Sequence, residues 1–255
     1  PCEEMRTQVF QLAGCNWRCW YCFVDFSLLS GNPKYGKFLS AEEMLDMYLE
    51  QENPPQIFDL SGGQPDLVPE WCLWMMQEIE KRGLKDKVYV WLDDNLGTEV
   101  LWEVLTPEQI SYMATFPRHS RTCCFKGYDG VSFSFNTGQK NASSFDSQFS
   151  IFEKLLCSGF DLYGYVTLTS PAGNCTKEKI KWFVDRLQMI HPNLPLRTIP
   201  LEIKPFTNTT SRMDSSKLDD SFVEQQKAYD FWWDELTKRF TYKELTLPYD
   251  KVQIR

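Results

Sequence analysis

Short apolar runs alternate with longer amphipathic stretches along most of the chain. The apolar runs predict six buried strands, at residues 5–13, 57–60, 87–92, 131–135, 160–169 and 196–204. The amphipathic stretches predict helices that begin at residue 40 and then cover 69–82, 98–105, 107–115, 144–158, 176–190 and 222–240. Strands therefore alternate with helices from one end of the sequence to the other.

Several helix ends carry their own signals. Ser40 and Glu43 have the spacing of a capping box, in which each side chain bonds the other's backbone amide. Thr106 and Pro107 are typical of a helix start, and Gly83 of a residue just beyond a helix end. These signals fix where the predicted helices begin and end.

The order of elements predicts an α/β fold. Strands separated by helices pair in parallel through right-handed crossovers. Six units are too few to close a barrel of eight, so we expect a partial (β/α)6 TIM-like barrel, an open crescent of parallel strands. Residues that follow the strands then meet on one rim, where such folds place their chemistry.

Composition narrows the class of protein. The 255 residues fit one domain, residues 1–255, and because the chain begins with Pro1 we expect it to be trimmed from a longer one. The net charge of −8 disfavours nucleic acid as a partner, and the absence of an apolar run of 18 residues disfavours a membrane. Nine cysteines, with Cys123 and Cys124 adjacent, suit a reducing compartment, so we expect a soluble, cytoplasmic protein.

Three cysteines follow the first predicted strand. Cys15, Cys19 and Cys22 have the spacing CxxxCxxC, with Gly14 just before them. Three thiolates on a short loop can each bind one iron of a 4Fe–4S cluster, and no fourth cysteine stands nearby. The spacing therefore predicts a cluster with one iron open to an outside molecule.

A second motif ends the second predicted strand. Residues 61–65 read Ser-Gly-Gly-Gln-Pro, and Gly62 and Gly63 permit a tight turn whose backbone can approach a ligand closely. On its own a pair of glycines indicates only a turn. Together with the cysteine spacing and the strand order, it indicates a cofactor site.

The two motifs together resemble the radical S-adenosylmethionine (radical SAM) superfamily. Its signature favours an aromatic residue before the third cysteine, where Tyr21 stands, and its GGEP motif corresponds to residues 62–65, with Gln64 in place of the glutamate. The resemblance implies a 4Fe–4S cluster on the three cysteines and S-adenosyl-L-methionine on the open iron, with the glycine backbone binding the methionine ammonium. It also implies reductive cleavage to a 5′-deoxyadenosyl radical that abstracts hydrogen from a substrate.

Other polar residues follow the later predicted strands. We expect contacts to the ribose hydroxyls or the methionine carboxylate at strand ends. The fifth predicted strand resembles the stretch that contacts adenine in radical SAM activases, which implies a contact to adenine from Thr169. Ser132 and Ser134 would share one face of the predicted fourth strand, and Lys204 could meet substrate at the end of the sixth. The alternative is that residues 93–95 only cap the next helix. The expected cofactor contacts beyond the two motifs are Asp93, Asn95, Ser134, Asn136 and Thr169.

The substrate is left open by the sequence. Within the superfamily the chain looks most like glycyl-radical-enzyme activases, which resemble pyruvate formate-lyase activating enzyme, although the GPG phrase that many carry before the first strand is absent. This resemblance implies a peptide or protein substrate and an electron donor such as flavodoxin or ferredoxin. The alternatives are a small molecule or nucleoside under a lid made of loops 116–128 and 207–221, and a non-enzymatic metal-binding module with a fourth protein ligand.

The remaining cysteines do not form a second motif. An auxiliary cluster would need spaced ligands, and these thiols show no CxxC spacing, so buried or incidental cysteines are the favoured interpretation. His119 and His191 are too far apart in sequence to indicate a metal site. The cysteines concerned are Cys2, Cys123, Cys124, Cys157 and Cys175.

Overall fold

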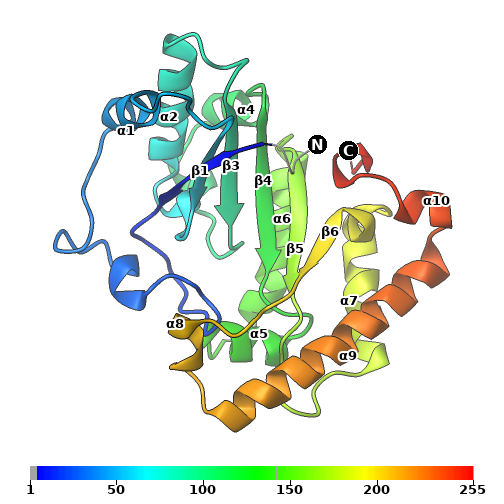
Figure 1. Ribbon diagram of the computed structural model, residues 1–255. Helices are drawn as coiled ribbons and strands as arrows, with labels where there is room; N and C mark the ends of the chain where they lie inside the picture. Colours follow the sequence, from blue (N-terminus) through cyan, green and yellow to red (C-terminus); the bar gives the residue numbers. More distant parts are fainter. Residues whose placement is uncertain (1–4, 142, 255) are drawn as a thin grey trace.

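The computed structural model describes residues 5–141 and 143–254. Its centre is a six-stranded sheet in which every neighbouring pair is parallel and the strands follow in chain order (Figure 1). Cys2 lies outside the described residues. The strands are β1 (Thr7–Gln11), β2 (Ile57–Ser61), β3 (Tyr89–Asp94), β4 (His119–Phe125), β5 (Leu162–Thr167) and β6 (Thr198–Leu201).

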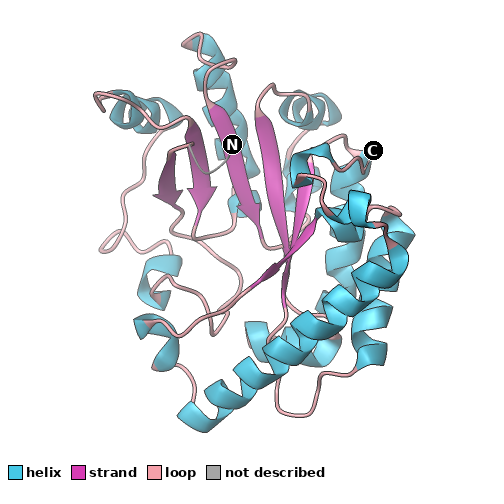
Figure 2. Cartoon of the chain, turned by 45° about the vertical axis from the view of Figure 1, so that its right-hand side comes forward, coloured by secondary structure: helices cyan, strands magenta, loops and turns pink. Residues whose placement is uncertain are grey.

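Helices connect the strands and cover the outer side of the sheet (Figure 2). None of the helices in the described part of the chain is long and apolar enough to cross a membrane. The α-helices are α1 (Ala41–Leu49), α2 (Pro69–Lys81), α3 (Val100–Val104), α4 (Pro107–Ala114), α5 (Gly130–Thr137), α6 (Ser143–Cys157), α7 (Lys177–Ile190), α8 (Thr207–Thr210), α9 (Ser215–Arg239) and α10 (Tyr242–Leu245). Four short 3-10 helices are η2 (Phe26–Leu29), η3 (Pro65–Leu67), η4 (Leu194–Arg197) and η5 (Tyr249–Lys251).

The sheet curves but does not close. Over the described residues, β1 pairs only with β2 and β6 only with β5, so the two edge strands leave a gap between them. Val9 on β1 is 47% exposed at this gap, although it lies on a strand. The prediction of an open, partial (β/α)6 barrel is therefore confirmed.

The two faces of the sheet differ in polarity. On β2, Phe58 and Leu60 are fully buried towards the helices, and Phe58 packs on Tyr48 of α1. The alternate positions, Asp59 and Ser61, face the concave side. Period-two alternation thus gives an apolar core outside the barrel and a polar interior within it.

The predicted fourth strand is wrong. Residues 131–135 belong to helix α5, which Asp129 begins by accepting a hydrogen bond from the amide of Ser132. The strand is β4, His119–Phe125, inside the segment 116–128 that was predicted to be a loop. Its polar sequence hid it, because Arg121 is fully buried there and paired with Asp66.

The predicted loop 207–221 also needs correction. It contains α8 and the beginning of α9, which starts at Ser215 rather than at residue 222. The remaining predicted elements exist, with ends that differ by a few residues. The Ser40–Glu43 capping box is present, and Gly83 has the positive φ of 68° expected beyond a helix end.

Candidate functional site at the rim of the sheet

The three motif cysteines share one cavity at the carboxyl ends of the strands. Cys15, Cys19 and Cys22 are free thiols that line a space of about 350 Å³. Gly62 and Gly63 line the same space from the end of β2. The structure therefore brings the two sequence motifs together.

The cysteine loop is tied to three other segments. Gly14 accepts a hydrogen bond of 2.8 Å from the amide of Gln64, at the glycine turn. The amide of Asn16 donates to the carbonyl of Gly97 at 2.8 Å, after β3. The backbone and the indole N–H of Trp20 both donate to Asn136 of α5, each at 3.1 Å. These hydrogen bonds hold the backbone around the thiols against the glycine turn, the segment after β3 and α5.

Two arginines bind the carbonyls of this loop. Arg212, between α8 and α9, donates to the carbonyls of Trp20, Cys22 and Val24. Arg18 donates to the carbonyls of Cys15 and Trp17 at 2.7 and 2.8 Å, and to that of Leu29 at 3.1 Å. Guanidinium groups suit this task because they present several donors in a fixed plane.

The glycine turn is required by the chain's own packing. Gly62 has a φ of 75°, a conformation that L side chains rarely adopt. A Cβ on Gly63 would lie 2.4 Å from the carbonyl oxygen of Gly14 and 2.7 Å from that of Leu12. The backbone of the glycine turn packs directly against the backbone before the cysteines, so the turn and the cysteine loop form one unit. A contact from this turn to a bound amino acid stays a prediction.

The side chain of Gln64 points away from the cavity. It is 3% exposed, its amide nitrogen donates to Asp94 at 2.8 Å, and its oxygen accepts from the amide of Asn95 at 2.8 Å. Asp94 is held in turn by Arg121 at 3.2 Å. Gln64 therefore braces the ends of β2 and β3, and a direct side-chain contact with a cofactor has no support in this arrangement.

Asp93 and Asn95 both line the cavity, as predicted from their place after β3. Ser61 donates to one oxygen of Asp93 and the indole of Trp91 to the other. Asn95 donates to Asn16 at 2.8 Å and lies 3.6 Å from the sulfur of Cys15. A hydrogen bond to a ligating sulfur is one of the means by which proteins tune iron–sulfur clusters.

Three of the predicted contacts lie elsewhere. Ser134, Asn136 and Thr169 are not among the residues that line the cavity. Asn136 is fully buried in α5, and its oxygen accepts from Trp20 and from Thr169. Ser134 is on the same helix, not on a strand. Their predicted contacts with a cofactor stay predictions. Lys204 follows β6, is exposed and pairs with Glu202 at 3.0 Å.

Lys126 was missed by the sequence analysis. It follows β4, lines the cavity beside Cys124, and places its ammonium 5.9 Å from the ring centre of Tyr21. It makes no ion pair with a carboxylate among the described residues. Assigning β4 correctly would have placed Cys124 and Lys126 on the same inward face, two residues apart.

Electrostatics around the thiols follow from burial and from this lysine. Burial raises the pKa of Cys19 to about 12, although the nearby Lys126 opposes the shift. Burial also raises the pKa of Cys22, against the hydrogen bond from Val24 and the charges of Lys126 and Arg212. Burial acts to lower the pKa of Lys126, but Cys124 and Tyr21 hold it well above its usual range. The lysine is therefore a cation placed beside thiols that must lose protons to bind metal.

The donor set fits a cluster better than a single ion. Over the described residues, no three cysteine, histidine or carboxylate side chains are close enough to hold one metal ion together. A cubane needs no such closeness, because each thiolate binds a different iron. The three motif thiols, the amide near the Cys15 sulfur and the lysine all suit an anionic iron–sulfur group, and Cys124 is a fourth free cysteine that lines the same cavity.

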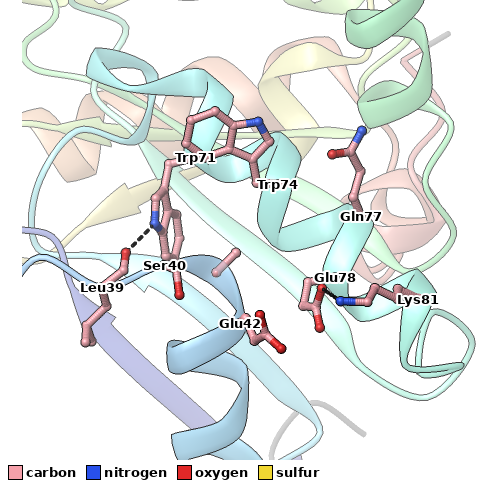
Figure 3. Close-up of a pocket in the computed structure, with 9 residues that line it drawn as sticks. Leu39, Ser40, Glu42, Trp71, Trp74, Gln77, Glu78 and Lys81 are labelled. Atoms are coloured by element: carbon pink, nitrogen blue, oxygen red, sulfur yellow. Dashed lines mark hydrogen bonds and ion pairs between the residues drawn. The ribbon is translucent and has the colours of Figure 1, made fainter.

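A second hollow lies on the outer surface between α1 and α2 (Figure 3). It measures about 470 Å³, and Trp71 closes one side by donating to the carbonyl of Leu39 at 2.9 Å. None of the motif cysteines or glycines lines it. The candidate site is therefore the cavity at the rim.

Comparisons with known proteins bear on the fold. No family model matches the sequence, and no curated protein does. SuiB from Streptococcus suis, solved with S-adenosylmethionine bound, matches with a TM-score of 0.61 and 15% identity, over 91% of this chain and 48% of SuiB. The structure of anSMEcpe with bound AdoMet matches with a TM-score of 0.54 and 19% identity, over 91% of this chain and 59% of the other.

A third solved structure also matches the fold. TsrM from Kitasatospora setae, a radical S-adenosylmethionine methyltransferase with cobalamin and a 4Fe–4S cluster bound, matches with a TM-score of 0.52 and 10% identity, over 92% of this chain and 53% of TsrM. The chain shares the fold of these three proteins. It spans about half the length of SuiB and of TsrM.

Proposed function

We propose that the chain is a radical SAM enzyme. Cys15, Cys19 and Cys22 would hold a 4Fe–4S cluster with one open iron, where S-adenosyl-L-methionine binds. The observation that carries the proposal is that one cavity at the carboxyl ends of parallel strands is lined by all three thiols, by the glycine turn and by Lys126.

The chain's own residues would bind and orient S-adenosyl-L-methionine and shield the cluster from solvent. When bound and reduced, the cluster supplies one electron that breaks the bond between sulfur and C5′, giving methionine and a 5′-deoxyadenosyl radical, which takes a hydrogen atom from substrate. The backbone of Gly62 and Gly63 is exposed to the cavity for a methionine ammonium, and Lys126 offers a cation to the carboxylate or to the cluster. Tyr21 is held over this space, its hydroxyl accepting from Thr167 at 2.9 Å.

The substrate class that the fold favours is a peptide or protein, as in the activases that the sequence resembles. Two structures with this fold were solved with peptides, SuiB with its precursor peptide SuiA and anSMEcpe with the Cp18Cys peptide. The gap between β1 and β6 leaves the barrel interior open to an extended chain. The small-molecule alternative requires a lid made of two loops. One of them, residues 116–128, is not a loop, because it contains β4. The electron donor would be a flavodoxin or a ferredoxin.

The test is product formation by the anaerobically reconstituted protein. With dithionite and S-adenosylmethionine we expect 5′-deoxyadenosine and methionine, together with the absorbance of a 4Fe–4S cluster. Cys19→Ala removes one cluster ligand and is expected to abolish both products.

Cys157→Ala is the matched control, because Cys157 is an exposed cysteine at the end of α6. It should retain the cluster and the activity. Equal deoxyadenosine yields from the wild type and Cys19→Ala would refute the assignment of the cluster ligands, and no deoxyadenosine from the wild type would refute the enzymatic proposal.

A further inference from the structure

Polar and aromatic side chains on the concave face of the sheet form a region next to the cysteine cavity, here called the acidic chamber. Towards the amino ends of the strands it has an aromatic floor, in which Trp91 packs between Tyr89 and Tyr163 with ring centres 6.0 and 5.4 Å away. Asp59 on β2 is the register partner of Trp91, at the level of this floor, and Asp93 on β3 and Thr122 on β4 are the next inward positions towards the carboxyl ends. Asp93 and Thr122 also line the cysteine cavity, so these side chains adjoin it.

The two carboxylates in this chamber have unequal surroundings. Asp93 accepts hydrogen bonds from Ser61 and Trp91. Asp59 is only 9% exposed, and its Oδ1 has no hydrogen-bond partner within the described chain. Neither carboxylate forms an ion pair with a basic residue of that chain. A buried carboxylate without a donor or a cation is costly, which points to an occupant that supplies both.

A neutral side chain gives a second, independent indication. Thr122 is 2% exposed, lines the cavity, and its hydroxyl has no hydrogen-bond partner among the described residues. It is the register partner of Asp93 on the next strand. Native proteins rarely leave such a hydroxyl unpaired. Two oxygens on the same concave face, Asp59 Oδ1 and Thr122 Oγ1, therefore have no hydrogen-bond donor within the described chain.

Asp59 faces the negative charge of Asp93, whereas Lys126, in the adjoining cysteine cavity, is a cation that acts to lower the pKa of Asp93 against the effect of burial. Burial and the neighbouring Asp93 raise the pKa of Asp59 to about 7. Burial raises the pKa of Tyr165 on β5 to about 12, with Asp93 and Asp59 adding to the shift, so this phenol faces the same two carboxylates. An anionic group would be repelled by Asp59 and Asp93, and a neutral hydroxyl would leave Asp59 without a counter-ion.

We propose that this acidic chamber, formed by Asp59, Asp93 and Thr122, binds a cationic nitrogen group of the substrate, a primary ammonium or a guanidinium. Such a group supplies positive charge to the carboxylates and N–H donors to the free oxygens at once. Its carbon chain would extend from the floor towards the cysteine rim. The inference rests on the proposed function, since it names a chemical class for the substrate of that same site.

The binding test uses small probes of matched shape. Reconstituted protein with S-adenosylmethionine is titrated with pentylammonium and with 1-pentanol, and affinity is measured by ligand-detected NMR. We expect the ammonium to bind at least about tenfold more tightly than the alcohol, because hydrogen bonds to a charged group are worth about 1.5–3 kcal/mol.

Two isosteric variants locate the site. Asp59→Asn is expected to weaken pentylammonium binding by roughly tenfold to a hundredfold and leave pentanol binding unchanged. Thr122→Val should weaken it by several-fold. Asp86→Asn is the control, because Asp86 is an exposed acid in the turn before β3. Thermal unfolding midpoints check that each variant is folded.

The outcomes separate this inference from the function on which it rests. Equal affinity for the two probes, an ammonium affinity that Asp59→Asn leaves unchanged, or potassium ion binding in place of the ammonium would overturn the chamber's assignment. Deoxyadenosine formation by the wild type without any probe tests the proposed function separately. A second arm uses a lysine peptide and its norleucine analogue. Tighter binding of the lysine peptide than of pentylammonium supports the site with a peptide as the substrate that carries the cation. The reverse order supports the site with a free amine as the substrate.

Discussion

Gln64 shows why this chain departs from the motif that it resembles. Radical SAM proteins commonly carry glutamate here, but this side chain must donate to Asp94 as well as accept from Asn95. A carboxylate can only accept. Because Asp94 lies deep against Arg121, the position demands an amide in this protein.

Gln64→Glu is therefore expected to destabilise the protein, even though it restores the resembled motif. It would bring a second carboxylate to the position 2.8 Å from Asp94. We expect a loss of about 1–3 kcal/mol in the free energy of unfolding, measured by urea denaturation at pH 8.

Gln77→Glu is the control for this substitution, because Gln77 is exposed on α2. It should leave the free energy of unfolding nearly unchanged. A Gln64→Glu protein as stable as the wild type would contradict the bracing role given to Gln64.

Among individual residues, the sequence predicted those that belong to a spaced motif or follow directly after a strand. The three cysteines, the two glycines, Asp93 and Asn95 all reach the cavity. Lys126, Asp59 and Thr122 escaped notice because their importance comes from what faces them across a curved sheet. Spacing along the chain carries no signal for a neighbour on another strand.

The cysteine loop is the element on which the site depends, and much of its support comes from the other end of the chain. Arg212 donates to three of its carbonyls and stacks 3.8 Å from the ring centre of Phe26. Asn208 of α8 adds a hydrogen bond of 2.9 Å to the carbonyl of Phe23. Helix α8 and the segment that follows it thus hold the loop that follows β1.

We expect Arg212→Ala to loosen the cluster. Without the guanidinium, three carbonyls beside Cys22 lose their donors, and the loop can open. The measurement is the decay of the 4Fe–4S absorbance under a chelator, which should be several-fold faster than in the wild type.

Arg212→Lys should restore only part of the retention, since an ammonium lacks the planar fork. Lys217→Ala is the control, because Lys217 is an exposed cation in the first turn of α9. An unchanged decay in Arg212→Ala would show that the loop does not need this support.

The prediction of secondary structure failed at β4, whose residues are polar although they are buried in the structure. The segment of β4 reads His-Ser-Arg-Thr-Cys-Cys-Phe and has every residue buried. Arg121 pairs there with Asp66 and Asp94 through one guanidinium nitrogen, and His119 bonds the carbonyl of Val90 at 2.9 Å. A strand that buries polar and charged side chains cannot be recognised from hydrophobicity. The apolar alternation of residues 131–135 was mistaken for that strand, although Asp129 begins a helix there.

The whole molecule is an open sheet with its chemistry at one rim. The order of strands and helices was enough to predict six parallel units and an unclosed barrel, because right-handed crossovers leave few other arrangements. The substrate could not be predicted in the same way. It depends on the concave face, to which β2, β3, β4 and β5 all contribute inward side chains.

The central claim is that S-adenosylmethionine binds the open iron of a cluster held by Cys15, Cys19 and Cys22. The most direct measurement is electron paramagnetic resonance of the dithionite-reduced protein, with and without S-adenosylmethionine labelled with 15N in its amino group. The account predicts that the labelled compound shifts the g-values of the cluster and adds a hyperfine coupling from the amino nitrogen. A cluster signal that is unchanged by the compound, with no nitrogen coupling, would contradict it.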